Sequence, residues 1–167
     1  NGRHWPACLR AAEEVKCAGG LVSFDGGANR YEAKFDELFP LIDILIVARD
    51  FAERSTGSDN RAEQLAHLSR EGATIVGITD GEKGSWFRTK SGDSFHQEAF
   101  PVDPLIDTTG CGDVFHGAFL YGKGEGKDWE ECAQIASAAA ALNAQALGGR
   151  GNLPTRRDLA SLLGRNL

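Results

Sequence analysis

The sequence predicts an α/β fold in which a doubly wound, mostly parallel sheet is covered by helices and ends in a small antiparallel hairpin. Short apolar runs alternate with amphipathic helical patterns through the first half of the chain, and a hairpin signature follows the last of these runs. Two of the three runs are continuous rather than alternating. Continuous apolar strands are typical of parallel sheets that carry helices on both faces.

The predicted elements follow one another in a regular order. Pro6 begins a helix whose apolar residues recur at helical spacing as far as Ala18, before Gly19 and Gly20 end it. Buried strands are predicted at 21–24, 42–47 and 74–79, with helices at 33–38 and 61–70 between them. The hairpin comprises 85–89 and 93–97, and the last third is helical at 114–121, 129–147 and 155–163.

The composition excludes several classes of protein. With 167 residues, 41% of them hydrophobic, the chain suits one domain with a buried core. A net charge of −6 provides no basic surface for a nucleic-acid backbone. No apolar run approaches the roughly 20 residues that span a bilayer. The four cysteines show no C-x-x-C pair, which favours reduced thiols. We therefore expect a cytoplasmic protein without nucleic-acid or membrane partners.

The stretch Asp107-Thr108-Thr109-Gly110-Cys111-Gly112-Asp113, followed by an apolar helical pattern, carries the clearest chemical signal. Small residues let the backbone turn tightly into a helix, and the free N–H groups of a first helical turn attract anions. A carboxylate at Asp113 would repel a phosphate unless it accepts the proton of an attacking hydroxyl. This combination predicts phosphoryl transfer. In the alternative interpretation Asp113 only complements the helix dipole, and the G-x-G-D stretch alone favours neither.

The longer stretch closely resembles the D-T-x-G-A-G-D signature of the ribokinase-like (PfkB) carbohydrate kinases, with Cys111 at the usual Ala. The resemblance is nearest to ketohexokinase-like and sulfofructose kinase-like members. It implies a ribokinase-like fold, a catalytic base at Asp113, and an anion hole formed by the backbone of Gly110, Cys111 and Gly112. It also implies ATP and Mg²⁺ as cofactors, and a monovalent cation such as K⁺ held by Asp107 and Thr109.

Three further segments are similar to the same family. Residues 79–84 look like its T-x-G-x-x-G turn, which implies that Thr79, Gly81 and Gly84 approach the nucleotide. Residues 136–143 resemble the wall of its adenine pocket, which implies a binding role for Ala136, Ala139 and Asn143. Residues 148–151 resemble its cation-binding loop. For each alanine taken singly, close helix packing is the favoured alternative.

One motif of the family is absent. Many relatives carry N-x-x-E after the strand predicted at 42–47, where it organises Mg²⁺, and here the positions read Ala48, Arg49, Asp50 and Phe51. Asp50 or Glu53 could replace the motif through water. An acidic residue at a helix start is more often a dipole partner or a solvated side chain.

The resemblance implies that residues 1–167 are the C-terminal nucleotide-binding and catalytic portion of a kinase, with the sugar-binding half and the lid absent. The implied activity is ATP-dependent phosphoryl transfer to a hydroxyl of a sugar or sugar-like molecule, and the lid implies a homodimer. Ketoses, sulfo-sugars, ribose and nucleosides remain open as acceptors. The alternative is a catalytically silent nucleotide-binding fragment or degenerate relative, against which the presence of Asp113 argues.

The cysteines give a separate expectation. Cys111 lies at a predicted helix N-terminus, where the dipole favours a thiolate and therefore a reactive side chain. Cys8, Cys17 and Cys132 occur at helical core spacing and are expected to react slowly.

Overall fold

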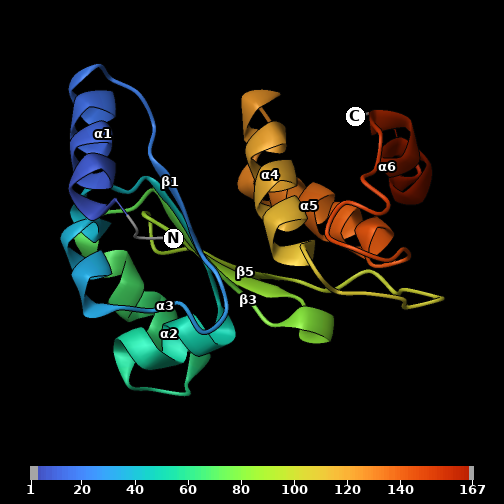
Figure 1. The fold of residues 1–167 in the computed structure, drawn as a ribbon, viewed down its shortest axis with the longest axis horizontal. Coiled ribbons are helices and arrows are strands. Elements are labelled where there is room, and N and C mark those ends of the chain that lie inside the picture. Colours follow the sequence, from blue (N-terminus) through green and yellow to red (C-terminus); the bar gives the residue numbers. More distant parts are fainter. Residues whose placement is uncertain (1–3, 166–167) are drawn as a thin grey trace. The chain divides into compact units, whose positions relative to one another are not determined.

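The structure is a computed structural model that describes residues 4–165. These residues form two compact units (Figure 1). Unit 1 extends to Thr79 and includes Trp86–Phe95, whereas unit 2 consists of Asp80–Ser85 and the chain from His96 onward. No helix within the described range is long and apolar enough to cross a membrane.

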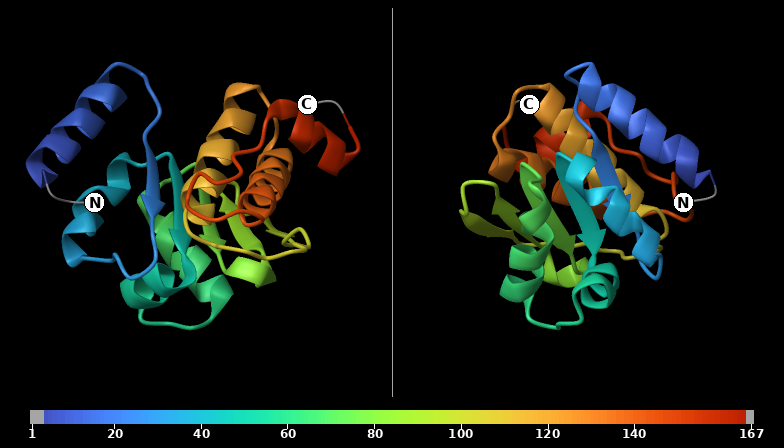
Figure 2. Two further views of the ribbon diagram at one scale, coloured as in Figure 1. Left: turned by 45° about the vertical axis from the view of Figure 1, so that its right-hand side comes forward. Right: turned by 90° about the vertical axis from the view of Figure 1, so that its left-hand side faces the viewer.

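A five-stranded sheet runs in the order β1-β2-β3-β4-β5 (Figure 2). The strands are β1 Ser23–Gly26, β2 Ile44–Ala48, β3 Ile75–Thr79, β4 Ser85–Thr89 and β5 Ser94–Gln97. The first three pair in parallel. A tight turn, in which the Gly92 N–H donates to the Thr89 carbonyl at 3.0 Å, joins β4 to β5, so these strands run antiparallel. The mixed, helix-covered sheet confirms the predicted fold class.

The core of unit 1 lies around β2 and β3. Both strands are buried along their continuous apolar runs, as the sequence predicts. Helices α2 (Arg49–Thr56) and α3 (Arg61–Leu68) contribute Phe51 and Leu68 to this core, and α1 (Trp5–Cys17) packs Trp5 and Leu9 against it. Gly77 in β3 makes room for a neighbouring ring, because a Cβ there would lie 2.4 Å from a ring carbon of Phe87.

Two elements of unit 1 differ from the prediction. Strand β1 begins at Ser23 rather than 21, because the Val22 N–H donates to the side chain of Asp43 at 2.8 Å, and the ladder pairing starts with Ser23 opposite Ile44. The helix predicted at 33–38 is instead a pair of 3-10 helices, Ala33–Glu37 and Phe39–Leu41. Pro40 keeps the two segments from joining into one α-helix, because it lacks the N–H that would bond the carbonyl of Asp36.

Unit 2 contains helices α4 (Cys111–Gly124), α5 (Trp129–Asn143) and α6 (Arg156–Leu163). Helices α4 and α5 pack closely at Gly122, where a Cβ would lie 3.2 Å from the Cα atom of Cys132. Ile135, Ala138, Ala139 and Leu159 form the core between α5 and α6. Helix α6 begins with a capping box, in which the side chains of Thr155 and Asp158 bond each other's backbone N–H groups.

Candidate active site

Helix α4 begins at Cys111, three residues earlier than the sequence predicts. Residues 107–110, which lead into it, are called the motif loop below. Gly110 is the N-cap, in the left-handed conformation with φ 75°, and Cys111 is the first helical residue. The N–H of Cys111 donates to the Thr108 carbonyl at 3.2 Å, but the N–H groups of Gly112 and Asp113 have no acceptor within residues 4–165. The space beside them is open, because a Cβ on Gly112 would meet no atom within 4 Å. Two free donors at a helix N-terminus are suited to binding an anion.

Asp113 lies in the first turn of α4, next to these donors, and is exposed. Asp113 thus lies in the same helical turn as the two free N–H groups and is open to solvent. This position suits a base that takes a proton from a hydroxyl attacking a bound phosphoryl group. It equally suits a partner for the helix dipole, so geometry alone keeps both interpretations of Asp113.

Asp107 joins the motif loop to the segment that follows α5. Its Oδ1 atom accepts the N–H of Thr109 at 2.8 Å, and its Oδ2 atom accepts the N–H of Gly148 at 2.8 Å. Hydrogen bonds from Thr109, followed by the one from Gly148, hold the pKa of Asp107 below its ordinary value. Asp107 is thus a charged clamp between two loops.

This clamp also explains why α5 ends at Asn143 rather than at 147. In a longer helix the N–H of Gly148 would donate to the carbonyl of Ala144. Instead Gly148 binds the Asp107 carboxylate, and the Ala144 carbonyl accepts the N–H groups of Ile106 at 2.9 Å and Asp107 at 3.2 Å. The motif loop therefore replaces the last turn of the predicted helix.

The stability of this clamp should depend on pH. A carboxylate whose folded-state pKa is lowered stabilises the fold above its unfolded-state pKa of about 3.9, and this contribution is lost as the pH falls through the lower folded-state pKa. We expect Asp107→Asn to lower the melting temperature at pH 7, and the difference from wild type to shrink below about pH 4. Thermal unfolding between pH 7 and pH 3, with tetramethylammonium as the only buffer cation, would measure it. A difference that stays constant across this range would contradict the ionic clamp.

The two loops also touch through their glycines. A Cβ on Gly110 would lie 2.6 Å from both the Cα atom and the carbonyl oxygen of Gly149. Glycine is therefore required at Gly110 for two reasons, its positive φ and this close approach. The sequence shows the glycines at 148 and 149 but gives no sign that Gly149 packs on Gly110.

The structure places the predicted adenine-pocket residues in the interior. Ala136 and Ala139 are 0% and 1% exposed, and Ala139 belongs to the core between α5 and α6. Both alanines are thus packed in the interior, and their role in an adenine pocket stays a prediction. Asn143 is also fully buried, and its Nδ2 atom lies 3.4 Å from the Thr109 carbonyl and 3.8 Å from the Cys111 sulfur. Its amide is directed at the motif loop.

The expectations for the cysteines need correction. Burial is the main reason that the pKa of the Cys111 thiol is raised, so the expectation of a dipole-stabilised thiolate is wrong. Cys111 is partly buried, with its sulfur 3.5 Å from the Ala140 carbonyl. The expected burial of Cys8 and Cys17 is also wrong, because both are exposed on α1. Cys132 is buried as expected, and burial raises its pKa to about 11.

The predicted nucleotide turn is divided between the units. Thr79 ends β3 in unit 1, where its hydroxyl donates to the Val47 carbonyl at 3.4 Å. Gly81 begins a 3-10 turn with φ 54°, and a Cβ there would meet no atom within 4 Å. Glycine is required at position 84 for a structural reason, because a Cβ on Gly84 would lie 2.2 Å from the Gln97 carbonyl oxygen. Of these residues, Gly81 has the open space that a ligand needs.

The acidic residues after β2 have partners within the protein. The Asp50 carboxylate accepts the N–H of Asn29, and Glu53 pairs with Arg49 at 3.4 Å. Within residues 4–165 no group of three or more His, Cys, Asp or Glu residues is placed to hold a metal ion. The ordinary interpretation, in which these side chains are solvated or pair locally, accounts for both residues.

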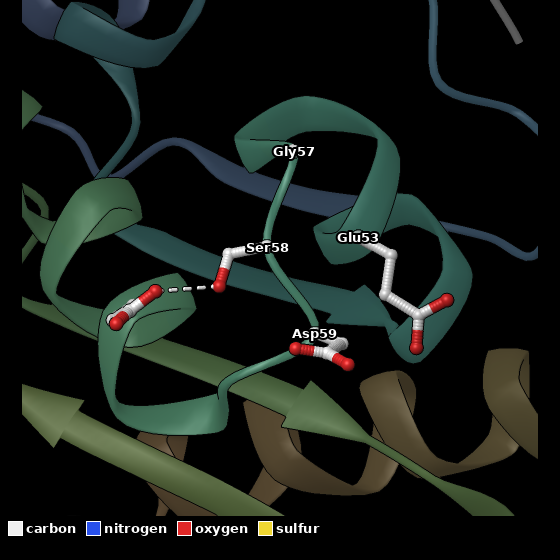
Figure 3. A pocket seen from close by; sticks show the side chains of 5 residues that line it. Glu53, Gly57, Ser58 and Asp59 are labelled. Carbon is white, nitrogen blue, oxygen red and sulfur yellow. Dashed lines mark hydrogen bonds between the residues drawn. The ribbon is translucent and has the colours of Figure 1, made fainter.

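A hollow of about 620 Å³ lies in unit 1 and is lined by Glu53, Gly57, Ser58, Asp59 and Glu63 (Figure 3). The Ser58 hydroxyl donates to Glu63 at 2.6 Å. Because the lining carries three carboxylates and no basic side chain, it would repel a phosphate. This hollow is not the anion site.

Known proteins are similar to this chain in both sequence and fold. Ribokinase from Arabidopsis thaliana is 32% identical over 160 residues, which cover 93% of this chain and 42% of the relative. The solved structure of Arabidopsis ribokinase complexed with ribose and ATP has a TM-score of 0.82 at 31% identity and covers 93% of this chain and 51% of that chain. A fructokinase double mutant from Vibrio cholerae, solved with fructose, ADP and potassium ion, has a TM-score of 0.86 at 25% identity, over 98% of this chain and 56% of that chain.

The chain thus spans about half the length of the relatives that it matches. The model of the pfkB family of carbohydrate kinases matches residues 5–156, which include the motif loop, helices α4 and α5, and the loop at Gly148 and Gly149. The match extends over most of the chain, and the chain therefore belongs to the pfkB carbohydrate kinase family.

Proposed function

We propose that the protein containing this chain is a cytoplasmic carbohydrate kinase that transfers a phosphoryl group from ATP to a hydroxyl of a sugar or sugar-like molecule. In this proposal residues 1–167 are the C-terminal nucleotide-binding and catalytic portion, and a further segment supplies the sugar-binding half and the lid. A lid contact between two copies would make the protein a homodimer. Family membership, and relatives that are ribokinases and deoxygluconokinases, support the reaction class.

The observation that carries the proposal is the pair of free N–H groups at Gly112 and Asp113, with the Asp113 carboxylate beside them. ATP supplies the phosphoryl group that is transferred. The two N–H groups and the positive end of the helix dipole stabilise negative charge on that group. The Asp113 carboxylate accepts the proton of the acceptor hydroxyl and so makes its oxygen a better nucleophile.

The acceptor is proposed only as a class. The Arabidopsis ribokinase structure contains ribose, and the Vibrio cholerae fructokinase structure contains fructose. Both are sugars, which supports a sugar as the acceptor, and a solved Burkholderia thailandensis nucleoside kinase in complex with inosine, 27% identical, supports a nucleoside as the alternative. A coupled assay of ADP release with a panel of ketoses, aldoses, sulfo-sugars and nucleosides would identify the acceptor. Absence of turnover with the whole panel would favour the silent nucleotide-binding alternative.

Gly112→Val tests the anion site directly. The structure has open space at the Gly112 Cβ position, so the chain should fold while the branched side chain crowds a ligand at the N–H groups. We expect ATP affinity and turnover each to fall by about tenfold or more. Calorimetry would measure the affinity. Gly124→Val is the matched control, because Gly124 lies at the other end of α4 and its Cβ position is equally open. Equal effects of the two variants would show that the anion site does not lie at Gly112.

Metal ions enter the proposal in two ways. The described residues include no group of three or more His, Cys, Asp or Glu placed around a metal ion, and we propose that Mg²⁺ arrives with the nucleotide. The Asp107 carboxylate, kept charged by its lowered pKa, and the neighbouring Thr109 are the proposed ligands of a monovalent cation. The potassium ion in the fructokinase structure supports K⁺ in this role.

We expect the protein to bind Mg²⁺ weakly in the absence of nucleotide. Magnesium ion is held poorly by sites that do not surround it with oxygen ligands, and it is usually bound together with substrate phosphates. Titration calorimetry with MgCl₂ alone, and then with MgCl₂ in the presence of ADP, would measure this. Micromolar affinity without nucleotide would show that the protein holds the ion itself.

A further inference from the structure

Asn143 is a buried polar residue that the proposed chemistry does not use. It is the last residue of α5 and is 0% exposed. The donor end of its amide is directed at the motif loop, with Nδ2 3.4 Å from the Thr109 carbonyl and 3.8 Å from the Cys111 sulfur. Its Oδ1 atom is buried and has no hydrogen-bond partner in the described structure.

The unpartnered oxygen makes Asn143 costly for folding. A buried polar atom that loses its bonds to water without gaining others destabilises the folded state. An apolar side chain of the same shape, such as leucine, would avoid this cost, and the surrounding helix is already rich in buried apolar residues. Because the oxygen only adds a cost, the NH₂ group must be the reason that an asparagine, and not a leucine, occupies this position.

Both acceptors of that amide flank the start of α4. The Thr109 carbonyl lies immediately before the N-cap Gly110, and Cys111 is the first helical residue. A bond to each side of Gly110 fixes the direction in which the following N–H groups of Gly112 and Asp113 point. The contacts with Asp107 and Gly149 hold the earlier part of the same loop, so Asn143 provides the remaining constraint.

We propose that Asn143 is a positioning residue that orients the anion-binding N–H groups by bonding the Thr109 carbonyl and the Cys111 sulfur from behind the loop. This assigns it a role different from lining an adenine pocket, since a fully buried side chain offers no surface to a ligand. The inference deepens the proposed function, and its kinetic test rests on that function. Small displacements of groups that stabilise a transition state lower the rate more than they weaken substrate binding.

The test is Asn143→Leu in the full-length protein, because leucine has nearly the same branched shape and lacks the donor. We expect turnover to fall about tenfold or more while the KM for ATP changes by less than about threefold. The melting temperature should change little, because the loss of the two donor contacts is offset by the removal of the unpartnered oxygen. Burial raises the pKa of the Cys111 thiol while the Asn143 amide lowers it, so alkylation by iodoacetamide is measured by mass spectrometry over a pH series and extrapolated to the fully ionised thiol. This limiting rate should become several-fold faster in Asn143→Leu because the loop is less restrained.

Gln64→Leu is the matched control. Gln64 is also a fully buried amide, but both of its ends have partners, with Nε2 2.6 Å from the Ser58 carbonyl and Oε1 2.8 Å from a guanidinium nitrogen of Arg61. Its replacement should lower the melting temperature and leave both turnover and Cys111 labelling unchanged. The exposed Cys8 and Cys17 serve as internal references for the labelling.

The outcomes separate this inference from the proposed function. A wild-type protein without kinase activity would contradict the proposed function, while the labelling comparison would still decide the role of Asn143. Unchanged Cys111 labelling in Asn143→Leu would overturn the inference. So would unchanged turnover in an active protein, or a fall in melting temperature as large as that of Gln64→Leu, because Asn143 would then be an ordinary structural residue.

Discussion

Asp113→Asn should lower turnover by about a hundredfold or more and change the affinity for ATP by less than about threefold. Asparagine keeps the size of the side chain and its place in the first turn of α4, but it cannot accept a proton from the acceptor hydroxyl. ATP binding depends on the backbone N–H groups, which the substitution does not alter. Steady-state kinetics and nucleotide calorimetry on the full-length protein would provide both values.

The alternative role of Asp113, as a partner for the helix dipole, predicts a different result. A carboxylate in the first turn of a helix contributes about 0.3–1 kcal/mol to stability, and its loss would lower the melting temperature by a few degrees without changing turnover. Glu130→Gln provides the control, because Glu130 is an exposed carboxylate in the first turn of α5. If both variants lose only a little stability and keep wild-type turnover, Asp113 is not the base.

The strands at the centre of the sheet could be predicted closely because their apolar runs are continuous. Strands β2 and β3 begin within two residues of the predicted positions. The edge strand β1 could not be placed as well, because its start depends on the Asp43 carboxylate binding the Val22 N–H from 21 residues away. Helix α5 was predicted too long for a similar reason, since a loop distant in sequence takes the carbonyl of Ala144. Periodicity reports local preference and not such long-range competition.

In the candidate site, too, the features with a local sequence signal could be predicted, and those that depend on contacts between distant residues could not. The glycine-rich approach to a helix N-terminus, with Asp113 next to it, is visible from residue types and spacing, although the helix begins three residues earlier than they predict. The clamp between Asp107 and Gly148 joins residues 41 positions apart and has no signature in the sequence. The orientation of Asn143 was missed because a small-residue helix suggests packing rather than a hydrogen bond to a loop. The expected thiolate at Cys111 also depends on the surroundings of the side chain, because burial raises the pKa of this thiol.

Gly110→Ala should lower the stability of the fold more than an alanine at either of two comparison glycines, Gly126 and Gly149. A non-glycine residue at φ 75° costs about 1–2 kcal/mol, and the new methyl group would lie 2.6 Å from two backbone atoms of Gly149, which cannot move aside as a side chain can. Overpacking of this kind costs about 1–3 kcal/mol more. For a protein of this size or larger, the sum corresponds to a fall in melting temperature of about 5–15 °C. Thermal unfolding followed by circular dichroism would measure it.

Two controls separate backbone strain from the contact between the loops. Gly126→Ala introduces a methyl group at φ 77° where no atom lies within 4 Å, so it should show the cost of the backbone conformation alone. Gly149→Ala introduces one 3.6 Å from the Cα atom of Gly110, an ordinary van der Waals distance, and should cost little. Gly110→Ala should therefore exceed the other two by at least about 1 kcal/mol. Equal losses at Gly110 and Gly126 would show that the two loops do not approach each other as closely as in the structure. The contact between Gly110 and Gly149 would then not help to hold the motif loop in place.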